Sequence, residues 1–118
     1  MSKIKVDVRL TSKEDNLRII AVGDKTGNRI SYKEEEIRVT ILTFPNRVEM
    51  ERVAKEYRVK LVFSFDNNDL STYKLIGHDE FLLDVKTKTL EITDNSIKVE
   101  YTLEDNDFAY ILSLEDLW

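Results

Sequence analysis

Apolar and polar residues alternate with a period of two along much of this chain, and this alternation limits the possible folds more than any other feature. In residues 3–10, Ile4, Val6, Val8 and Leu10 share one register while charged residues fill the other. Successive side chains of a strand point to opposite faces of a sheet, so this period is typical of strands with one wet face. The pattern returns in residues 97–104. The sequence therefore predicts an all-β fold.

The alternation and the turn residues together predict about ten strands. We expect them at residues 3–10, 17–22, 29–32, 37–43, 48–54, 57–64, 72–76, 81–92, 97–104 and 108–114. The second is a short, largely apolar run, which we expect to be buried on both faces and to be broken by the segment that begins at Gly23. Short joints imply antiparallel neighbours. The fold class is thus predicted to be an antiparallel up-and-down β-barrel of about eight to ten strands.

Residues 50–57 are the segment where a helix competes with this interpretation. Their Glu, Arg, Lys and Ala residues favour a helix by propensity. The period-two alternation continues through them, however, and a helix here would be short and poorly capped. We therefore predict a hairpin.

Length and composition indicate one globular domain covering residues 1–118. The 118 residues are 42% hydrophobic and 35% charged, which is ordinary for a soluble protein. The net charge of −5, with both signs interspersed, argues against nucleic acid as a partner. The chain has no cysteine, no apolar leader and no stretch long enough to span a membrane as a helix, so we expect a cytoplasmic protein without disulfides.

Several segments resemble one known family when taken in order. They are residues 30–35, 48–54, 58–63, 85–90 and 97–103, together with Tyr73 shortly before Gly77. In these segments the chain resembles the YwiB-like family of uncharacterised bacterial proteins. The resemblance implies a calycin-like (lipocalin-like) β-barrel in a bacterial cytoplasm, and it implies no activity.

Arg52 is the main candidate binding residue. The two-residue period places it on the inner face with Val48 and Met50, where a guanidinium removed from water needs an anion or several acceptors. Other polar side chains in inward registers are Tyr57, Tyr73, Thr87, Tyr101 and Tyr110. We predict a ligand site formed by Arg52, Tyr73, Thr87 and Tyr101 at one end of the barrel. The alternatives are that a bulge near Ala54 turns Arg52 outward, or that Arg52 pairs with an acid at the rim.

The remaining polar motifs are better explained by structure than by chemistry. His78, the single histidine, is expected in a solvated turn, because no metal ligands or nucleophile accompany it. The acidic segments at residues 66–69 and 105–107 lack the spacing of a calcium loop and are expected to be hairpin turns. The acidic run at residues 34–36 is expected to be solvated. The aromatic residues of the inner register are expected to fill the core.

No sequence motif points to catalysis, a metal site or a cofactor. The leading hypothesis is a non-catalytic protein that binds a small hydrophobic, amphipathic or anionic ligand in the barrel mouth. The alternative is a protein-interaction module that uses its outer face or the C-terminal segment at residues 114–118, and a homodimer is one partner arrangement that we consider. The commoner role of an apolar end such as Leu117 and Trp118 is to cap the barrel of its own chain.

Overall fold

The computed structural model describes residues 2–66 and 69–117 and contains eleven strands. In chain order these are β1 (Ser2–Ser12), β2 (Asn16–Thr26), β3 (Arg29–Glu34), β4 (Ile37–Phe44), β5 (Arg47–Val53), β6 (Tyr57–Phe63), β7 (Ser71–Leu75), β8 (Glu80–Leu83), β9 (Val85–Ile92), β10 (Ser96–Leu103) and β11 (Asn106–Asp116). No helix among the described residues is long and apolar enough to cross a membrane. The predicted all-β class is confirmed, with one strand more than expected.

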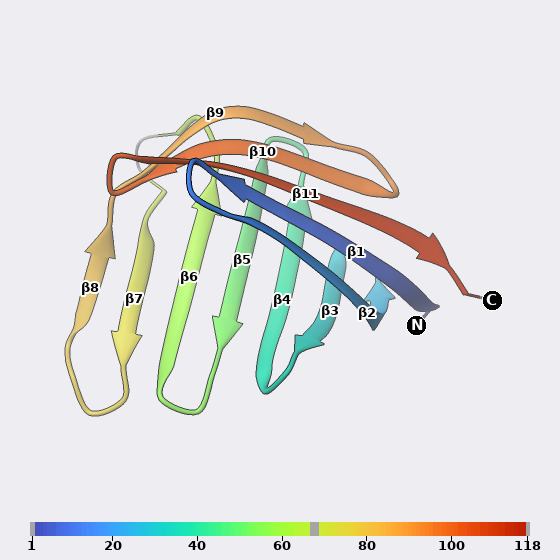
Figure 1. Cartoon of the computed structure of the whole chain (residues 1–118), viewed down its shortest axis with the longest axis horizontal. Helices are drawn as coiled ribbons and strands as arrows, with labels where there is room; N and C mark the ends of the chain where they lie inside the picture. Colours follow the sequence, from blue (N-terminus) through green and yellow to red (C-terminus); the bar gives the residue numbers. More distant parts are fainter. Residues whose placement is uncertain (1, 67–68, 118) are drawn as a thin grey trace.

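All eleven strands belong to one antiparallel sheet in the order β8-β7-β6-β5-β4-β3-β2-β1-β11-β10-β9. Neighbours in the sheet are neighbours in the chain, except that β11 pairs with β1 and that the consecutive strands β8 and β9 lie at opposite ends of the sheet. The predicted up-and-down arrangement is confirmed. In Figure 1, β3 to β8 form one layer, and β9, β10, β11, β1 and β2 form a second layer that crosses it. The sheet curls until β9 lies against β6, which makes a nearly closed barrel with β8 and β9 as its edges.

The alternating residues of both layers meet in one core, as the period of two predicts. The fully buried side chains are Ile4, Val6, Val39, Ile41, Val48, Phe63, Ile97, Val99 and Leu112. Phe63 packs against Tyr101 with 4.6 Å between ring centroids, so β6 of one layer contacts β10 of the other. Residues 50–57 form the end of β5 and the turn into β6, so the predicted hairpin is confirmed and the helix is excluded.

The second strand differs from the prediction in length and burial. β2 continues through Gly23 to Thr26, and the turn follows at Gly27. It is not buried on both faces, since Leu17, Ile20 and Val22 are all exposed. Gly23 is needed for close packing rather than for a turn: a Cβ at this position would lie 2.4 Å from the carbonyl oxygen of Ser31.

The predicted single strand at residues 81–92 is also wrong. The chain breaks at Asp84 into β8, which pairs with β7, and β9, which pairs with β10. Asp84 is the point where the chain passes from one layer to the other, and its backbone N–H donates to a carboxylate oxygen of Glu104 at 2.8 Å. The run looked continuous because both halves are apolar at alternate positions.

Candidate functional site

Alternate turns of an up-and-down sheet lie at the same end of the barrel, so this barrel has two ends with different residues. The β3–β4, β5–β6 and β10–β11 turns lie at the end that we call the Arg52 end. The β4–β5, β6–β7 and β9–β10 connections lie at the opposite end, which we call the Arg47 end. Each end carries a group of polar side chains.

At the Arg52 end, four polar side chains form a connected group that we call the Arg52 cluster: Tyr32, Glu34, Arg52 and Tyr110. Arg52 donates from Nη1 to Oε1 of Glu34 at 3.1 Å and from Nη2 to Oε2 at 2.6 Å. The Tyr32 hydroxyl donates to Oε1 of Glu34 at 3.1 Å and lies 3.4 Å from the Tyr110 hydroxyl. A bidentate arginine–carboxylate pair therefore sits beside two buried tyrosines.

The Arg52 cluster is largely removed from water. The side chain of Glu34 is 9% exposed and that of Arg52 27%. Burial opposes the charge on Arg52, but the hydrogen bonds and charge of Glu34 outweigh it and raise the pKa of Arg52. Burial raises the pKa of the Tyr110 hydroxyl well above its usual value, so this group is neutral at physiological pH. The positive charge of Arg52 is thus already matched within the chain.

The structure places Arg52 on the inner face, where the strand period put it. It stands opposite Val39 on β4 and Val59 on β6, and directly opposed residues share a face of the sheet. Of the three arrangements left open by the sequence, pairing with an acid is the one observed. That acid is Glu34, and the prediction that Glu34 is solvated is wrong, whereas Glu35 and Glu36 are exposed as expected.

Glu34 could have been found from the same alternation. It shares the register of Ile30 and Tyr32, both of which are buried. The run of three acids suggested a charged surface instead, because consecutive acidic residues are usually solvated. The register of the strand was the better guide.

The other predicted site residues lie at the same end. Tyr73 is half-buried on β7 and stacks on Tyr57 with 6.0 Å between ring centroids. Tyr101 is buried, and burial raises the pKa of its hydroxyl to about 12. Thr87 stands opposite Tyr101 because a bulge shifts the register of β9 by one residue at this point. Binding of a ligand by Arg52, Tyr73, Thr87 and Tyr101 stays a prediction.

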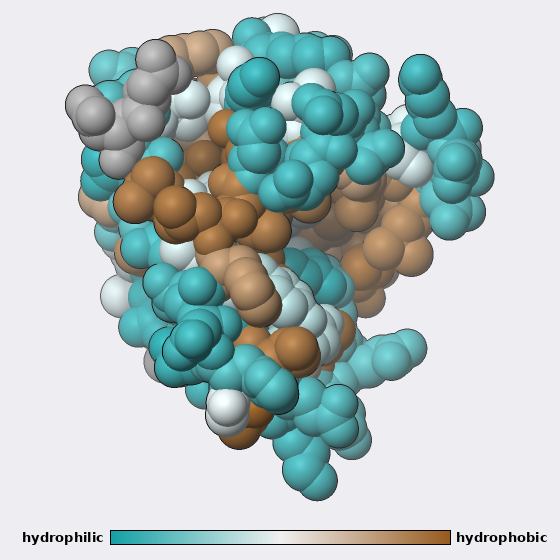
Figure 2. Space-filling view, turned by 90° about the vertical axis from the view of Figure 1, so that its left-hand side faces the viewer, coloured by the Kyte–Doolittle hydropathy of each residue, from teal (hydrophilic) through white to brown (hydrophobic). Residues whose placement is uncertain are grey.

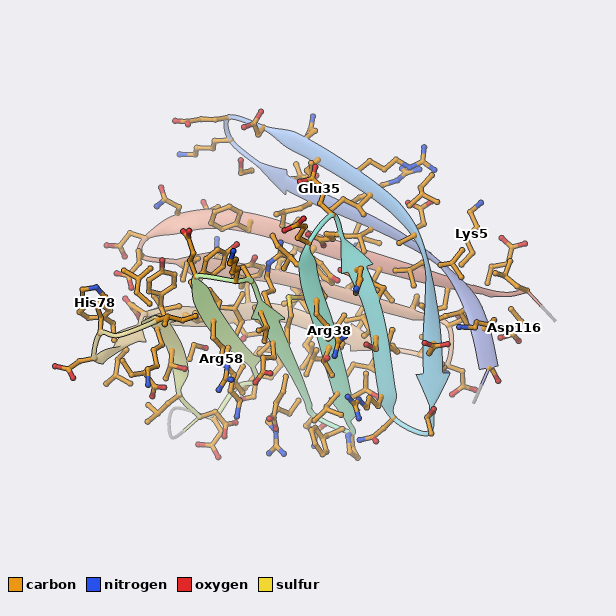
Figure 3. All side chains as sticks on the ribbon, turned by 90° about the horizontal axis from the view of Figure 1, so that it is seen from below. Lys5, Glu35, Arg38, Arg58, His78 and Asp116 are labelled. Atoms are coloured by element: carbon orange, nitrogen blue, oxygen red, sulfur yellow. The ribbon has the colours of Figure 1, made fainter. Side chains whose placement is uncertain are left out.

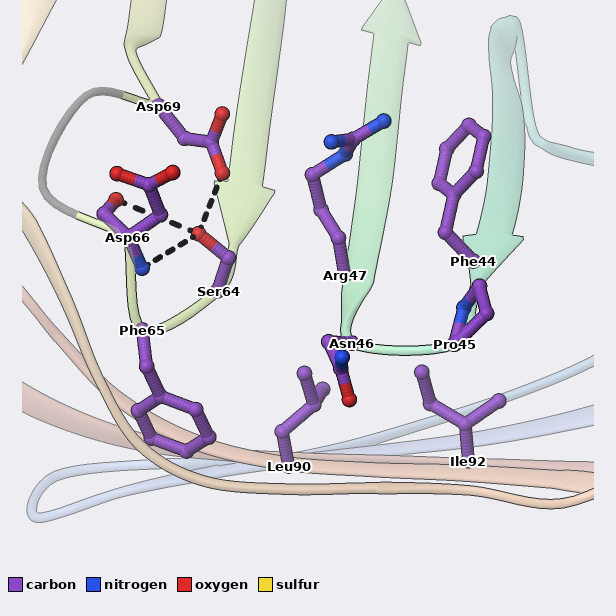
Figure 4. A pocket seen from close by; sticks show the side chains of 10 residues that line it. All are labelled: Phe44, Pro45, Asn46, Arg47, Ser64, Phe65, Asp66, Asp69, Leu90 and Ile92. Carbon is purple, nitrogen blue, oxygen red and sulfur yellow. Dashed lines mark hydrogen bonds between the residues drawn. The ribbon is translucent and has the colours of Figure 1, made fainter.

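At the Arg47 end, the surface holds an open hollow of about 910 Å³, which we call the Arg47 hollow (Figure 4). Three segments far apart in the sequence line it: residues 44–47, residues 64–69 as far as they are described, and β9. Its apolar lining residues are Phe44, Pro45, Phe65, Leu90 and Ile92. Its polar lining residues are Asn46, Arg47, Ser64, Asp66 and Asp69.

Arg47 makes one apolar contact, with a residue that also lines the hollow, and one charged contact, with a residue that does not. Its guanidinium lies 4.2 Å from the centroid of the Phe44 ring, and its Nε donates to a carboxylate oxygen of Glu49 at 3.0 Å. The other Glu49 oxygen lies 3.4 Å from the Lys60 ammonium, so two cations share one carboxylate. This group of three side chains therefore carries a net positive charge.

The opposite rim of the hollow is held by hydrogen bonds around Ser64. The Ser64 hydroxyl donates to a carboxylate oxygen of Asp69 at 2.6 Å and accepts the backbone N–H of Asp66 at 3.2 Å. Phe65, between these residues, is 65% exposed. The acidic segment at residues 66–69 was predicted as a hairpin turn, and Asn67 and Asn68 of that segment lie outside the described residues.

The chain matches the family model described as a domain of unknown function, DUF1934, over residues 3–112. It belongs to the DUF1934 family. The structure also resembles the crystal structure of the YwiB protein from Bacillus subtilis, with a TM-score of 0.71 and 13% sequence identity over 98% of this chain and 92% of that one. The predicted YwiB-like resemblance is thereby confirmed. A search of curated proteins found no match.

Membership in the DUF1934 family assigns no activity to the side chains described above. Among residues 2–66 and 69–117, no three His, Cys, Asp or Glu side chains are close enough together to hold a metal ion. His78 is exposed in the β7–β8 turn, as expected. Leu117 donates its backbone N–H to the carbonyl oxygen of Lys3 at 3.1 Å, whereas Trp118, which with Leu117 was predicted to cap the barrel or to bind a partner, lies outside the described residues.

Proposed function

We propose that this DUF1934 protein is a non-catalytic binding protein that holds a small amphipathic acid in the Arg47 hollow. The observation that carries the proposal is the hollow itself: about 910 Å³, with apolar side chains along one side and a cation at its edge. Sites for small molecules usually span about 300–1,000 Å³ and combine an apolar lining with a few polar groups. The calycin-like barrel that the family resemblance implies supports such a role, as an analogy of fold.

The chemistry of the lining favours a ligand with an apolar body and an anionic head. Leu90, Ile92 and Phe65 offer apolar surface, and burying such surface against a ligand contributes about 25 cal/mol per Å². Arg47 has a planar guanidinium, whose geometry matches a carboxylate. Arg47 and Lys60 share the single carboxylate of Glu49, so one positive charge of this group is not balanced. Asp66 and Asp69 on the other rim disfavour an anionic head there, so the head should lie beside Arg47.

The Arg52 end is the weaker candidate for binding an acid. A ligand carboxylate would have to displace Glu34, which makes two hydrogen bonds to Arg52 in a site with little access to water. Arg47, in contrast, has a more exposed side chain and shares its carboxylate with Lys60. The two ends can be separated by experiment, because each contains one arginine of interest.

The test is a titration of the ¹⁵N-labelled protein with decanoate below its critical micelle concentration, followed by amide chemical shifts. We expect saturable shifts centred on residues 44–47, 64–66, 69 and 90–92. Arg47→Gln should weaken binding about tenfold, whereas Arg38→Gln, which changes an exposed arginine elsewhere, should not. Phe65→Ser should weaken binding by a similar factor, and the matched exposed apolar variant Ile76→Ser should not.

The outcome can contradict the proposal in three ways. Shifts that do not saturate, or that spread evenly over the surface, would mean that the hollow is not a site. Equal binding of decanol and decanoate would remove the role of Arg47. Loss of binding in Arg52→Ala but not in Arg47→Gln would move the site to the Arg52 end, where the sequence first placed it.

A further inference from the structure

Strand β2 has a free edge along most of its length. On one side β2 pairs with β1 from Asn16 to Lys25, but on the other side its pairing with β3 covers only Asp24 to Thr26. Figure 3 shows the β1–β2 hairpin diverging from β3 and β4, whose connecting turn carries Glu35. Alternate residues of an antiparallel strand direct their backbone groups to opposite sides. Every second residue within 16–22 therefore has its N–H and C=O facing away from β1, with no neighbouring strand among the described residues.

The free edge of β2 is apolar and carries no net charge. Leu17, Ile20 and Val22 are 50%, 54% and 63% exposed. The one charged residue of the segment is Arg18, and its guanidinium donates to both carboxylate oxygens of Asp7 on β1, at 3.2 and 2.9 Å. Two copies of the chain can therefore approach through this edge without repulsion between like charges there, although each copy has a net charge of −5.

The two outermost strands of the sheet, β8 and β9, have features that usually prevent strand addition. β9 carries Lys86 and Lys88 and is bent by the bulge opposite Glu100 and Tyr101. β8 is only four residues long, although its Phe81 and Leu82 are exposed. Figure 2, which faces the side of the molecule where β8 lies, shows apolar patches between hydrophilic ones. Among these three described edges, β2 alone combines length, exposed apolar side chains and the absence of an unpaired charged side chain.

We propose that the free edge of β2 pairs antiparallel with the same edge of a second copy of this chain. Centring the two-fold axis on Ile19 places Leu17 opposite the partner's Ala21 and Arg18 opposite the partner's Ile20. Ile19 then lies opposite the partner's Ile19. On this face of the joined strands, the Ile19 pair is flanked on each side by a pair of one Leu17 and one Ala21. The contact is isologous, and it joins the two barrels through one continuous sheet.

The first test is sedimentation equilibrium of the full chain. A contact of one strand pair is smaller than a standard interface, so we expect a monomer–dimer equilibrium with a Kd on the order of 100 µM. Ile20→Lys places a charge on the free edge at an exposed position and should leave only monomer at every concentration. Leu82→Lys makes the same change on the edge strand β8 and should leave the dimer intact.

The second test identifies the contact directly, because the chain contains no cysteine. Ile19→Cys should form an intermolecular disulfide on mild oxidation, since residues at the two-fold axis have Cα atoms about 5 Å apart. Leu82→Cys should not. Wild-type protein that stays monomeric at 1 mM would overturn the proposal. So would a dimer that Leu82→Lys dissociates and Ile20→Lys does not, which would assign the contact to β8.

Discussion

The strongest prediction concerns the ion pair between Arg52 and Glu34. Glu34 accepts three hydrogen bonds, two from Arg52 and one from Tyr32, and its side chain is 9% exposed. Removing one partner of such a pair leaves the other charge in a poorly solvated site, at a cost of about 3 kcal/mol. Glu34→Leu and Arg52→Met should therefore each lower the free energy of unfolding by about 3 kcal/mol.

The double variant Glu34→Leu/Arg52→Met distinguishes loss of the pair from loss of two independent side chains. Replacing a buried pair by apolar residues is often nearly neutral, so the double variant should lose no more than about 3 kcal/mol, against about 6 kcal/mol for additive effects. The measurement is urea unfolding at pH 7, followed by far-UV circular dichroism with m-values fitted for each variant.

A matched control is the pair Lys88 and Asp107, whose nitrogen and oxygen also lie 2.6 Å apart but whose side chains are about half exposed. The same cycle with Lys88→Met and Asp107→Leu should show no measurable coupling, because water and salt screen exposed pairs. If the Arg52 and Glu34 losses add, or if each single loss is below about 1 kcal/mol, then burial of the pair does not stabilise this end of the barrel.

Two further predictions test packing and burial. Gly23→Ala should destabilise the fold by about 2 kcal/mol or more in the same urea assay, because the added Cβ would lie 2.4 Å from the Ser31 carbonyl oxygen. Gly27→Ala is the control: a Cβ there would have no atom within 4 Å, and only its φ of 58° should cost about 1 kcal/mol. An equal or larger loss in Gly27→Ala would refute the close contact. Stability should also fall as pH rises from about 10 towards 12, because the pKa of Tyr101 is raised by burial to about 12 in the folded state and the unfolded chain releases this proton near pH 10. Tyr101 should contribute up to about 2 kcal/mol to this loss. The urea midpoint of Tyr101→Phe should therefore fall less steeply between pH 10 and 12 than that of the wild type, and equal slopes would contradict the prediction.

The hairpins of the fold were predictable from the sequence because each strand repeats one simple pattern. Residues 37–43, 48–54 and 57–64 alternate clearly and end in polar turns, and the corresponding strands β4, β5 and β6 differ from the prediction by a residue or so. The two errors arose where the period of two carries less information. A largely apolar run does not show which face of the strand is buried, so the exposure of β2 could not be predicted. The break at Asp84 depends on packing between the two layers, which no local pattern reports.

The candidate sites show the same division between local and distant information. The inner-face position of Arg52 follows from its own strand, but its partner Glu34 lies two strands away on β3. The Arg47 hollow joins residues near positions 45, 65 and 91, whose proximity depends on how far the sheet curls. No local pattern encodes that curvature, so the hollow could not be predicted without the structure.

The place of β1 in the sheet has a consequence for how this chain could be rearranged. β1 lies beside β11, and the backbone of Leu117 contacts that of Lys3, whereas the sheet itself ends at β8 and β9 on either side of Asp84. A circular permutant that joins the ends of β11 and β1 by a short linker and begins at Val85 would keep every strand pairing. Its strands would then follow one another along the chain in the same order as across the sheet. The pairing of β1 with β11, the most distant along the native chain, would become a local hairpin. Because local contacts speed folding, the permutant should fold faster than the parent.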